Sequence, residues 1–323
     1  MVHRFKQLAF AASLTLIATS ALANNWPTRP ITWVVPFGAG GNFDLIARIV
    51  AKEVGKDLKQ AIIIQNKPGA GGVLGAAYVA HSKPDGYTFL VGGNGTVTNT
   101  LIRHDQPYKD EELTPVAPLA QSPSVTVIAA NSPYKNLREF IDAQKAHHVS
   151  KVTFATAGVG STPHFVAGLF KIASGLDISP IQYKSGLDTL LAVASGQVPL
   201  ASESVSVVQP LVQAGRVKAV AVTLPTRSPL LPNVPTTKEQ GLGTMQMAHF
   251  VGIWAPSSVP AGILDQMNKT INKALKSQDV QKTFASSGAE AVIQSRTQFA
   301  QSMKAERARL KKVVAAAGMN AQD

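Results

Sequence analysis

Cysteine is absent from all 323 residues of the chain. This absence excludes disulfides, thiolate metal sites, a cysteine nucleophile and a lipid-modified N-terminal cysteine. Common enzyme motifs are missing too: there is no G-x-x-x-x-G-K-[ST], no G-x-S-x-G and no H-E-x-x-H. The glycine-rich stretch 69–74 fails the dinucleotide fingerprint because Leu74 occupies the third glycine position. We therefore expect no catalytic residue, no cofactor and no metal site, and the chain is predicted not to be an enzyme.

Long apolar runs are also scarce, and the one of note lies at the N-terminus. His3, Arg4 and Lys6 precede an apolar stretch from Leu8 to Ala18, and the small-residue triplet 21–23 follows it. This order is typical of a secretory signal peptide. A membrane span is the alternative, but the stretch is short of the about 20 residues that a hydrocarbon core requires. We predict a signal peptide at residues 1–23, cleavage after Ala23, and a soluble periplasmic protein.

Acidic residues are few, at 19 against 31 lysines and arginines. Without Arg4 and Lys6 the mature chain keeps 29 basic residues, which gives a net charge of +10. The basic residues are spread thinly and do not interleave with aromatic residues as in single-strand binders, so we expect no nucleic-acid partner. The charge favours attraction of anionic solutes or of an acidic face on a membrane partner, with simple solubility as the alternative.

Short runs rich in Val and Ile alternate with helix-length stretches, which is the pattern of an α/β protein with largely parallel sheets. The runs predict strands at 31–35, 61–65, 88–92, 125–130, 152–155, 178–183, 198–202 and 218–223. Helices are predicted at 44–56, after 72, from 137, from 164, up to 194, at 263–276 and at 297–317. Proline-bearing stretches at 105–118, predicted as a loop, and at 225–235 interrupt the alternation. We expect a discontinuous first domain of residues 24–125 and 225–323, completed by the last third of the chain, and a second domain of residues 126–224.

A glycine-rich turn, residues 36–44, follows the first predicted strand. Glycines let the backbone turn tightly and aim several N–H groups at one point, where the positive end of the next helix favours an anion. The alternative is that these glycines serve the geometry of the turn alone. Asp44 is interpreted as a helix N-cap rather than a catalytic acid, because a carboxylate there satisfies backbone donors.

A second turn of this kind, residues 156–164, lies in the other predicted domain. Ser161 and Thr162 can cap the following helix or donate to a ligand oxygen, and His164 can donate to a ligand or be structural. A third turn, 92–96, would abut the first if adjacent strands end at one sheet edge. Two anion-tuned turns, one in each domain, predict a ligand clamped between them.

Six short motifs stand in order along the mature chain. They are Trp26-Pro27-Thr28-Arg29-Pro30-Ile31, Pro36-Phe37 with Gly40-Gly41, Asp44 and Ala47-Arg48, then Asn66-Lys67-Pro68-Gly69-Ala70-Gly71-Gly72, Pro84-Asp85-Gly86-Tyr87-Thr88, Gly158-Val159-Gly160-Ser161 leading to His164, and Leu231-Pro232-Asn233-Val234-Pro235-Thr236. Together they resemble the Bug, or tripartite tricarboxylate transporter (TctC-like), periplasmic substrate-binding proteins over essentially the whole mature chain.

The resemblance implies a type II periplasmic-binding-protein fold: two α/β domains, a central cleft that closes on a small carboxylate, and two hinge crossovers. In this family the ligand carboxylate is held mainly by backbone groups of the first turn and by the second-domain loop, and helix-terminal amides need no arginine beside them. The ligand-binding residues we expect are Phe37, Gly38, Ala39, Gly40, Gly41, Asn42, Asp44, Asn94, Thr96, Thr156, Ala157, Gly158, Ser161, Thr162, His164, Tyr183 and Glu203.

Three departures from the family pattern weaken any transfer of ligand identity. Ser185 interrupts a motif that is usually Tyr-Lys-Gly, Pro199 replaces a common Asp, and Phe250 replaces a usual Trp. Glu203 is placed at a strand end that faces the cleft, where an acid would repel a second anionic group and favour an ammonium or a hydroxyl. The alternative is that Glu203 points to solvent or pairs with Lys184.

The expected function is periplasmic capture of a mono- or dicarboxylate for uptake. The expected partners are that ligand and the membrane permease subunits of a tripartite tricarboxylate transporter, and the protein itself is expected to be a monomer. A sensor component for a membrane kinase and a hydrolase on the same scaffold are the alternatives.

Overall fold

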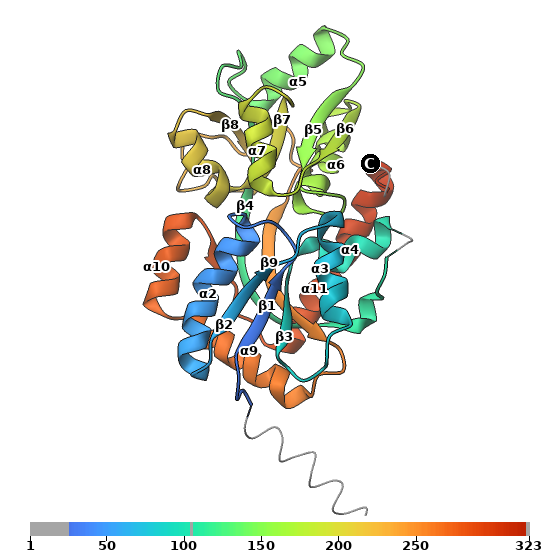
Figure 1. The fold of residues 1–323 in the computed structure, drawn as a ribbon. Coiled ribbons are helices and arrows are strands. Elements are labelled where there is room, and N and C mark those ends of the chain that lie inside the picture. The colour runs from blue at the N-terminus through green and yellow to red at the C-terminus, as the bar shows by residue number, and fades with distance from the viewer. Residues whose placement is uncertain (1–25, 104–105, 321–323) are drawn as a thin grey trace, which may run out of the picture.

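The computed structural model describes residues 26–103 and 106–320, which form two α/β lobes stacked along one axis (Figure 1). The predicted signal peptide lies outside the described residues. The first lobe is lower in Figure 1 and its strands run in the order β2-β1-β3-β9-β4. The second lobe, above it, continues the path from β4 through β7 and β5 to β6.

The strands follow the predicted alternation, with β9 and β10 as additions. They are β1 (Ile31–Val35), β2 (Ile62–Asn66), β3 (Thr88–Gly92), β4 (Leu113–Ala129), β5 (Val152–Thr156), β6 (Ile178–Gln182), β7 (Leu200–Ser204), β8 (Val217–Val222), β9 (Ala248–Pro256) and β10 (Glu290–Ala291). β1 pairs in parallel with β2 and β3, and β5 with β6 and β7, while β9 runs antiparallel to both β3 and β4. β9 was not predicted from the sequence.

β4 joins the two lobes and corrects the predicted loop at 105–118 from Leu113 onward, where the chain is a strand. Up to Pro123 it pairs with β9, and from Ser124 it pairs with β7. Its register against β9 shifts between Pro115 and Ala117 and again between Pro118 and Ala120. Proline donates no ladder hydrogen bond, so within sheets it is found at edges and at bulges of this kind. The prolines therefore concealed a 17-residue strand.

The chain returns to the first lobe through the irregular stretch between β8 and β9. Thr223 fastens this return, because its hydroxyl donates to the carbonyl oxygens of Ser124 (3.0 Å) and Met247 (2.5 Å). Both connections thus lie side by side between the sheets. The domain limits given above, as limits of independent folding units, stay a prediction.

Ten α-helices cover the two sheets in the described residues. They are α2 (Asn42–Leu58), α3 (Val73–Ala80), α4 (Asn94–Ile102), α5 (Leu137–Ala146), α6 (Thr162–Ser174), α7 (Gly186–Ala194), α8 (Val205–Gln213), α9 (Ala261–Leu275), α10 (Gln278–Ser287) and α11 (Arg296–Ala317), with short 3₁₀ turns η2 (Ala70–Gly72) and η3 (Asp110–Glu112). α4, α8 and α10 were not predicted. α8 contains Pro210, which ordinarily interrupts a helix, and α4 begins inside the stretch interpreted as a third turn.

α11 packs against elements of both lobes, a contact with the second lobe that the prediction of a first domain completed by the last third did not include. Phe299 packs near the start of α11 with Trp254 of β9 (ring centroids 5.2 Å apart), whereas Leu310 and Val313 belong to the apolar core of the second lobe. The C-terminal end lies beside α6 in Figure 1. The helix therefore crosses the junction between the lobes and packs against both.

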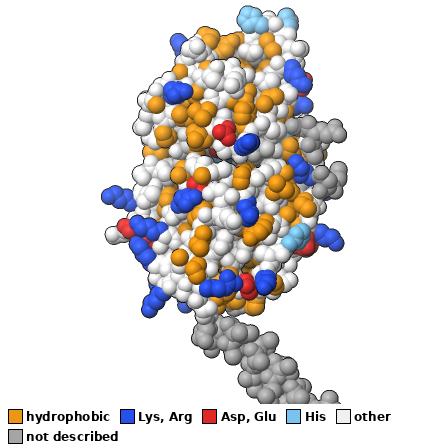
Figure 2. All heavy atoms as spheres, viewed as in Figure 1, with side chains coloured by type: hydrophobic (Ala, Val, Ile, Leu, Met, Phe, Trp, Pro, Cys, Tyr) orange, Lys and Arg blue, Asp and Glu red, His pale blue; other side chains and the backbone are white. Residues whose placement is uncertain are grey.

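The surface carries its charge diffusely. Figure 2 shows lysines and arginines on this face as separate spots among apolar and polar side chains, as the thin spread along the sequence indicates. Within residues 26–103 and 106–320, none of the helices combines the length and the apolar character that crossing a membrane requires.

Candidate ligand-binding cleft

The starts of three helices from both lobes meet at one small cavity between the sheets. It is lined by Phe37, Gly38, Gly41, Asn42, Phe43, Ala157, Ser161, Thr162, Pro163, Ser185, Gly186, Glu203 and His249. These residues include the first turns of α2, α6 and α7. The first amides of a helix have no acceptor inside the helix and bear its positive end, so the cavity is suited to an anion. The cavity volume is only about 30 Å³, so the two lobes lie close together around it.

Asp44 organises the first turn instead of lining the cavity. Gly41 is the N-cap of α2, so the prediction that Asp44 caps the helix is wrong; Asp44 is the third helical residue. Its carboxylate accepts from the Gly40 amide at 3.0 Å, Asn66 Nδ2 at 3.1 Å and Arg48 Nη2 at 2.9 Å. Burial opposes ionisation, but the Arg48 guanidinium and these donors together lower the pKa of Asp44. The turn is thus held in shape by a charged carboxylate behind it.

Asn42 places one uncommitted donor at the cavity. Its Oδ1 accepts from Ser206 Oγ of the second lobe at 3.3 Å, whereas its Nδ2 is buried and has no hydrogen-bond acceptor among the described residues. A buried amide N–H without a partner is costly. A ligand oxygen in the cavity would satisfy it.

The polar side chains of the second turn make local hydrogen bonds and a contact with the first lobe. Ser161 caps α6, accepting from the His164 amide at 3.4 Å, and also lines the cavity. Thr162 accepts from Asn94 Nδ2 at 3.3 Å, which makes a second hydrogen bond between the lobes. His164 accepts from the Gly160 amide through Nδ1 at 3.0 Å and is 1% exposed, so it shapes the turn and is not among the lining residues.

The start of α7 was missed as part of the site. Ser185 caps α7 by accepting from the Asp188 amide at 3.2 Å, and Gly186 lies against the Glu203 carboxyl group, 2.4 Å from where a Cβ would stand. Phe43, Pro163 and His249 are further lining residues absent from the expected set. A serine directly before an apolar helical run was an available signal for α7, while His249 lies on the unpredicted β9.

Glu203 and His249 form the rear wall. Both are buried, at 4% and 2% exposed, with Glu203 Oε2 3.8 Å from His249 Nε2. Burial lowers the pKa of His249 to about 3, so at neutral pH the imidazole is neutral and the contact is not an ion pair. Burial raises the pKa of Glu203 to about 7, with the Ser204 amide (3.0 Å) acting in the opposite direction. Glu203 therefore faces the cavity, and the alternatives of solvent exposure or pairing with Lys184 do not hold.

Glycines allow the lobes to interlock beside the cavity. A Cβ on Gly71 would stand 1.9 Å from the Val159 carbonyl oxygen, and one on Gly95 would stand 2.7 Å from the Gly160 carbonyl oxygen. Gly71 also has a left-handed backbone, with φ of +66°. Only glycine permits this approach of one lobe's backbone to the other's.

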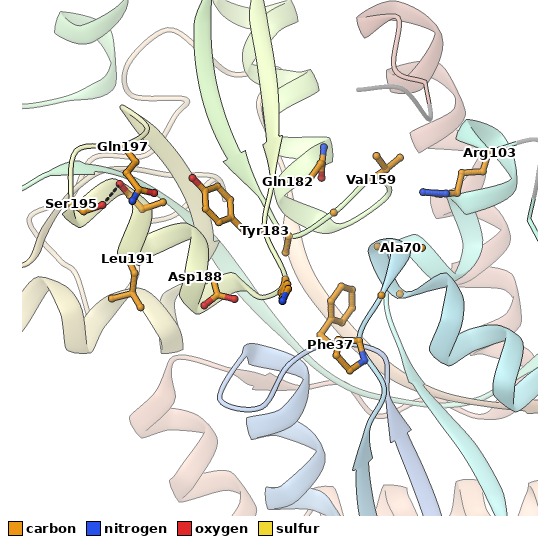
Figure 3. A pocket seen from close by; sticks show the side chains of 18 of the residues that line it. Phe37, Ala70, Arg103, Val159, Gln182, Tyr183, Asp188, Leu191, Ser195 and Gln197 are labelled. Atoms are coloured by element: carbon orange, nitrogen blue, oxygen red, sulfur yellow. Dashed lines mark hydrogen bonds between the residues drawn. The ribbon is translucent and has the colours of Figure 1, made fainter.

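A wider cleft of about 1410 Å³ opens beside the interlock, and Figure 3 shows Phe37 and Ala70 facing Tyr183, Gln182 and Val159 across it. Of the expected residues, Phe37, Ala157, Gly158 and Tyr183 line this cleft. The expected residues outside both spaces are Ala39, Gly40, Asp44, Asn94, Thr96, Thr156 and His164. Thr96 accepts from the Gly93 amide at 3.1 Å, and Thr156 donates to Gln182 at 2.8 Å. These residues shape the walls around the site.

The chain matches the family model described as tripartite tricarboxylate transporter family receptor over residues 46–319. Among curated proteins, the UPF0065 protein in the tcbD-tcbE intergenic region of Pseudomonas sp. (strain P51) is 31% identical over 314 residues, covering 96% of this chain and 93% of that protein. Protein BugT of Bordetella pertussis (strain Tohama I) is 32% identical over 280 residues, covering 86% of each.

Solved structures extend these matches to the fold. The periplasmic binding protein BugD superposes with a TM-score of 0.85 at 27% identity, covering 91% of this chain and 99% of BugD. Rpa4515 of R. palustris, with adipate, has a TM-score of 0.87 at 31% identity and covers 92% and 99%. MatC from Rhodopseudomonas palustris, with bound malate, has a TM-score of 0.83 at 32% identity and covers 90% and 100%. The expected two-domain periplasmic-binding-protein fold is confirmed.

Proposed function

The chain belongs to the tripartite tricarboxylate transporter receptor family of periplasmic solute-binding proteins, and from this we propose that it captures a small mono- or dicarboxylate and delivers it to the permease subunits of such a transporter. It acts by binding and release, without chemical turnover. The adipate and malate bound by two relatives at 31% and 32% identity are acids of this class.

The observation that carries the proposal is the convergence of three helix starts, two from the second lobe and one from the first, on one cavity. The 13 residues that line it, all in the described part of the chain, include neither lysine nor arginine. Backbone amides, the Asn42 side-chain amide and the hydroxyl groups of Ser161 and Thr162 are then the donors available to a carboxylate. Such donors are fixed in place by the fold and do not titrate.

Closure of the lobes completes the proposed site, because the donors of α2 belong to the first lobe and those of α6 and α7 to the second. The hydrogen bonds from Asn94 to Thr162 (3.3 Å) and from Ser206 to Asn42 (3.3 Å) hold this closed arrangement. A ligand that bridges the two lobes would shift the protein toward it.

Calorimetric titration of the mature protein with a panel of organic acids tests the proposal, with Gly71→Ala as the diagnostic variant. The added methyl group meets a backbone oxygen of the other lobe, so we expect affinity to fall by about tenfold or more. Gly241→Ala is the matched control, since Gly241 also has a left-handed backbone (φ +75°) but has no atom within 4 Å of the added methyl group. Equal affinities for the two variants, failure of every carboxylate to bind, or turnover of a bound acid would contradict the proposal.

A further inference from the structure

The cavity is lined by one acidic side chain and by no lysine or arginine, which is unusual for a site that receives an anion. Glu203 is 4% exposed, and its carboxyl group accepts from the Ser204 amide at 3.0 Å and lies 3.8 Å from Nε2 of His249. No lysine or arginine in the described chain lies within ion-pair distance of it. A buried carboxylate without a cation is unfavourable, so this end of the cavity favours a positively charged group.

The opposite end of the cavity offers donors. Asn42 Nδ2 is buried with no acceptor among the described residues, and it lies on the first residue of α2, where helix amides are also unpaired. Thr162 and Ser161 bring the start of α6 to the same space. One end of the cavity therefore complements a carboxylate, and the other complements a cation.

The two ends are close together. Asn42 Oδ1 accepts from Ser206 Oγ at 3.3 Å, Ser206 Oγ lies 2.9 Å from Ser204 Oγ, and the Ser204 amide donates to Glu203 at 3.0 Å. Three hydrogen bonds thus connect the donor end to the acceptor end. The cavity volume is only about 30 Å³, so the closed lobes favour a compact ligand.

We propose that this cavity selects small α-amino acids, with the ligand carboxylate at the starts of α2 and α6 beside Asn42 and the ligand ammonium against the carboxylate of Glu203. The inference rests on the proposed function and narrows its ligand class. A plain dicarboxylate would bring a second negative charge toward Glu203, whereas an ammonium next to the ligand carboxylate matches the short separation of the two ends.

Proton exchange accompanies such binding. In the unliganded cavity, burial raises the pKa of Glu203 to about 7, and a bound ammonium would lower it again. His249 on β9 is the titratable group at ion-pair distance from Glu203, and burial keeps it neutral, while Asp188 in the first turn of α7 lines the wider cleft and accepts from Ser185 Oγ at 2.8 Å. Binding of an α-amino acid at pH 7 therefore releases a fraction of a proton.

The test compares propionate, lactate, alanine and β-alanine, which share a three-carbon skeleton, by calorimetric titration. We expect alanine to bind at least about tenfold more tightly than propionate or β-alanine, as for a charge-assisted contact. Glu203→Gln keeps the shape of the side chain and should abolish this preference while carboxylate binding persists. Glu111→Gln, an exposed acid far along the chain in η3, is the control and should keep the preference.

Titrations of the unmodified protein in two buffers of different ionisation enthalpy measure the protons exchanged on binding without any substitution. Proton release with alanine supports the proposal. Proton uptake, a preference for propionate or lactate over alanine, or an alanine preference that survives Glu203→Gln overturns it, although carboxylate capture would stand. If none of the four acids binds, the inference of a small α-amino acid fails too, whereas the proposed function fails only if the wider panel of organic acids also shows no binding.

Discussion

Two carboxyl groups with little solvent exposure lie at or behind the candidate cavity, and their pKa values shift in opposite directions. Asp44 and Glu203 are 3% and 4% exposed. Asp44 has Arg48, the Gly40 amide and Asn66 around it, and its pKa is lowered. Glu203 has one backbone amide and a neutral imidazole, and its pKa is raised to about 7.

The difference has two causes: Glu203 is the more deeply buried of the two and has no cation beside it, whereas Arg48 and two further donors outweigh the effect of burial at Asp44. A carboxylate with a cation and several donors stays ionised and holds the structure around it, as Asp44 holds the first turn. A buried carboxylate without a cation can pair with a positively charged group of a ligand, which is the role we infer for Glu203. Each of the two carboxyl groups can be substituted separately, so their contributions to stability can be measured one at a time.

The largest expected effect is on the pH dependence of stability in Glu203→Gln. The folded-state pKa of Glu203, about 7, exceeds its ordinary value of 4.5, so the acid contributes its full stability below pH 4.5 and loses it as the pH rises through 7. The variant should therefore gain about 3 kcal/mol in unfolding free energy relative to the unmodified protein between pH 4.5 and pH 8.

Urea unfolding of the ligand-free proteins at pH 5 and pH 8 measures this gain, with Glu111→Gln as the control. His249 is present in both proteins, so its own titration cancels to a first approximation. If stability changes with pH in the same way in Glu203→Gln and in the unmodified protein, ionisation of Glu203 does not destabilise the fold and the prediction is wrong.

A smaller effect of opposite sign is expected for Asp44→Asn. This change removes the charge that Arg48 and two further donors stabilise, and we expect a loss of about 2 kcal/mol at pH 7. Because the folded-state pKa of Asp44 is below 3.8, this stability is present above pH 3.8 and is lost as the pH falls through the folded-state pKa.

Asp265→Asn is the comparison for that variant, since Asp265 also pairs with an arginine, Arg296 at 2.8 Å, but its side chain is 66% exposed. An exposed pair contributes about 0–1 kcal/mol. Chemical denaturation at pH 7 distinguishes the two, and equal losses would mean that the buried position of Asp44 adds nothing.

The smallest expected effect concerns packing around the Glu203 carboxyl group. In Gly186→Ala the new methyl group meets the Glu203 carboxyl group, so we expect a net loss of about 1 kcal/mol despite the better helix propensity of alanine. Gly262→Ala, in α9 with open space around it, should instead be neutral or stabilising. Thermal unfolding of both variants decides the point, and a stabilised Gly186→Ala would show that Glu203 moves freely.

Most of the architecture was predictable from periodicity. The strands β1 and β3 and the helices α2, α9 and α11 were placed within one or two residues of their observed ends, because apolar runs and amphipathic stretches record which face is buried. β4 was shortened by its prolines, and α8 was concealed by Pro210, since these residues are tolerated only through bulges or local contacts.

The site was predicted in outline. The turns that start α2 and α6 were identified and their glycine-rich residues do meet, but the start of α7 and His249 were missed. Their position depends on β7, β5 and β9 coming together from distant parts of the chain. Nothing in the local sequence around His249 indicates that it faces Glu203, 46 residues earlier.

By itself the sequence determined that the chain is an α/β protein without cysteine, that glycine-rich turns precede two of its helices, and that its motifs resemble one family of binding proteins. These features depend on short-range pattern and composition. Only the tertiary structure decided that three helix starts share one cavity, that Asp44 is paired and that Glu203 is not. Charge and partnership inside a protein depend on which distant segments exclude water from a group, and this is fixed when the two lobes fold together.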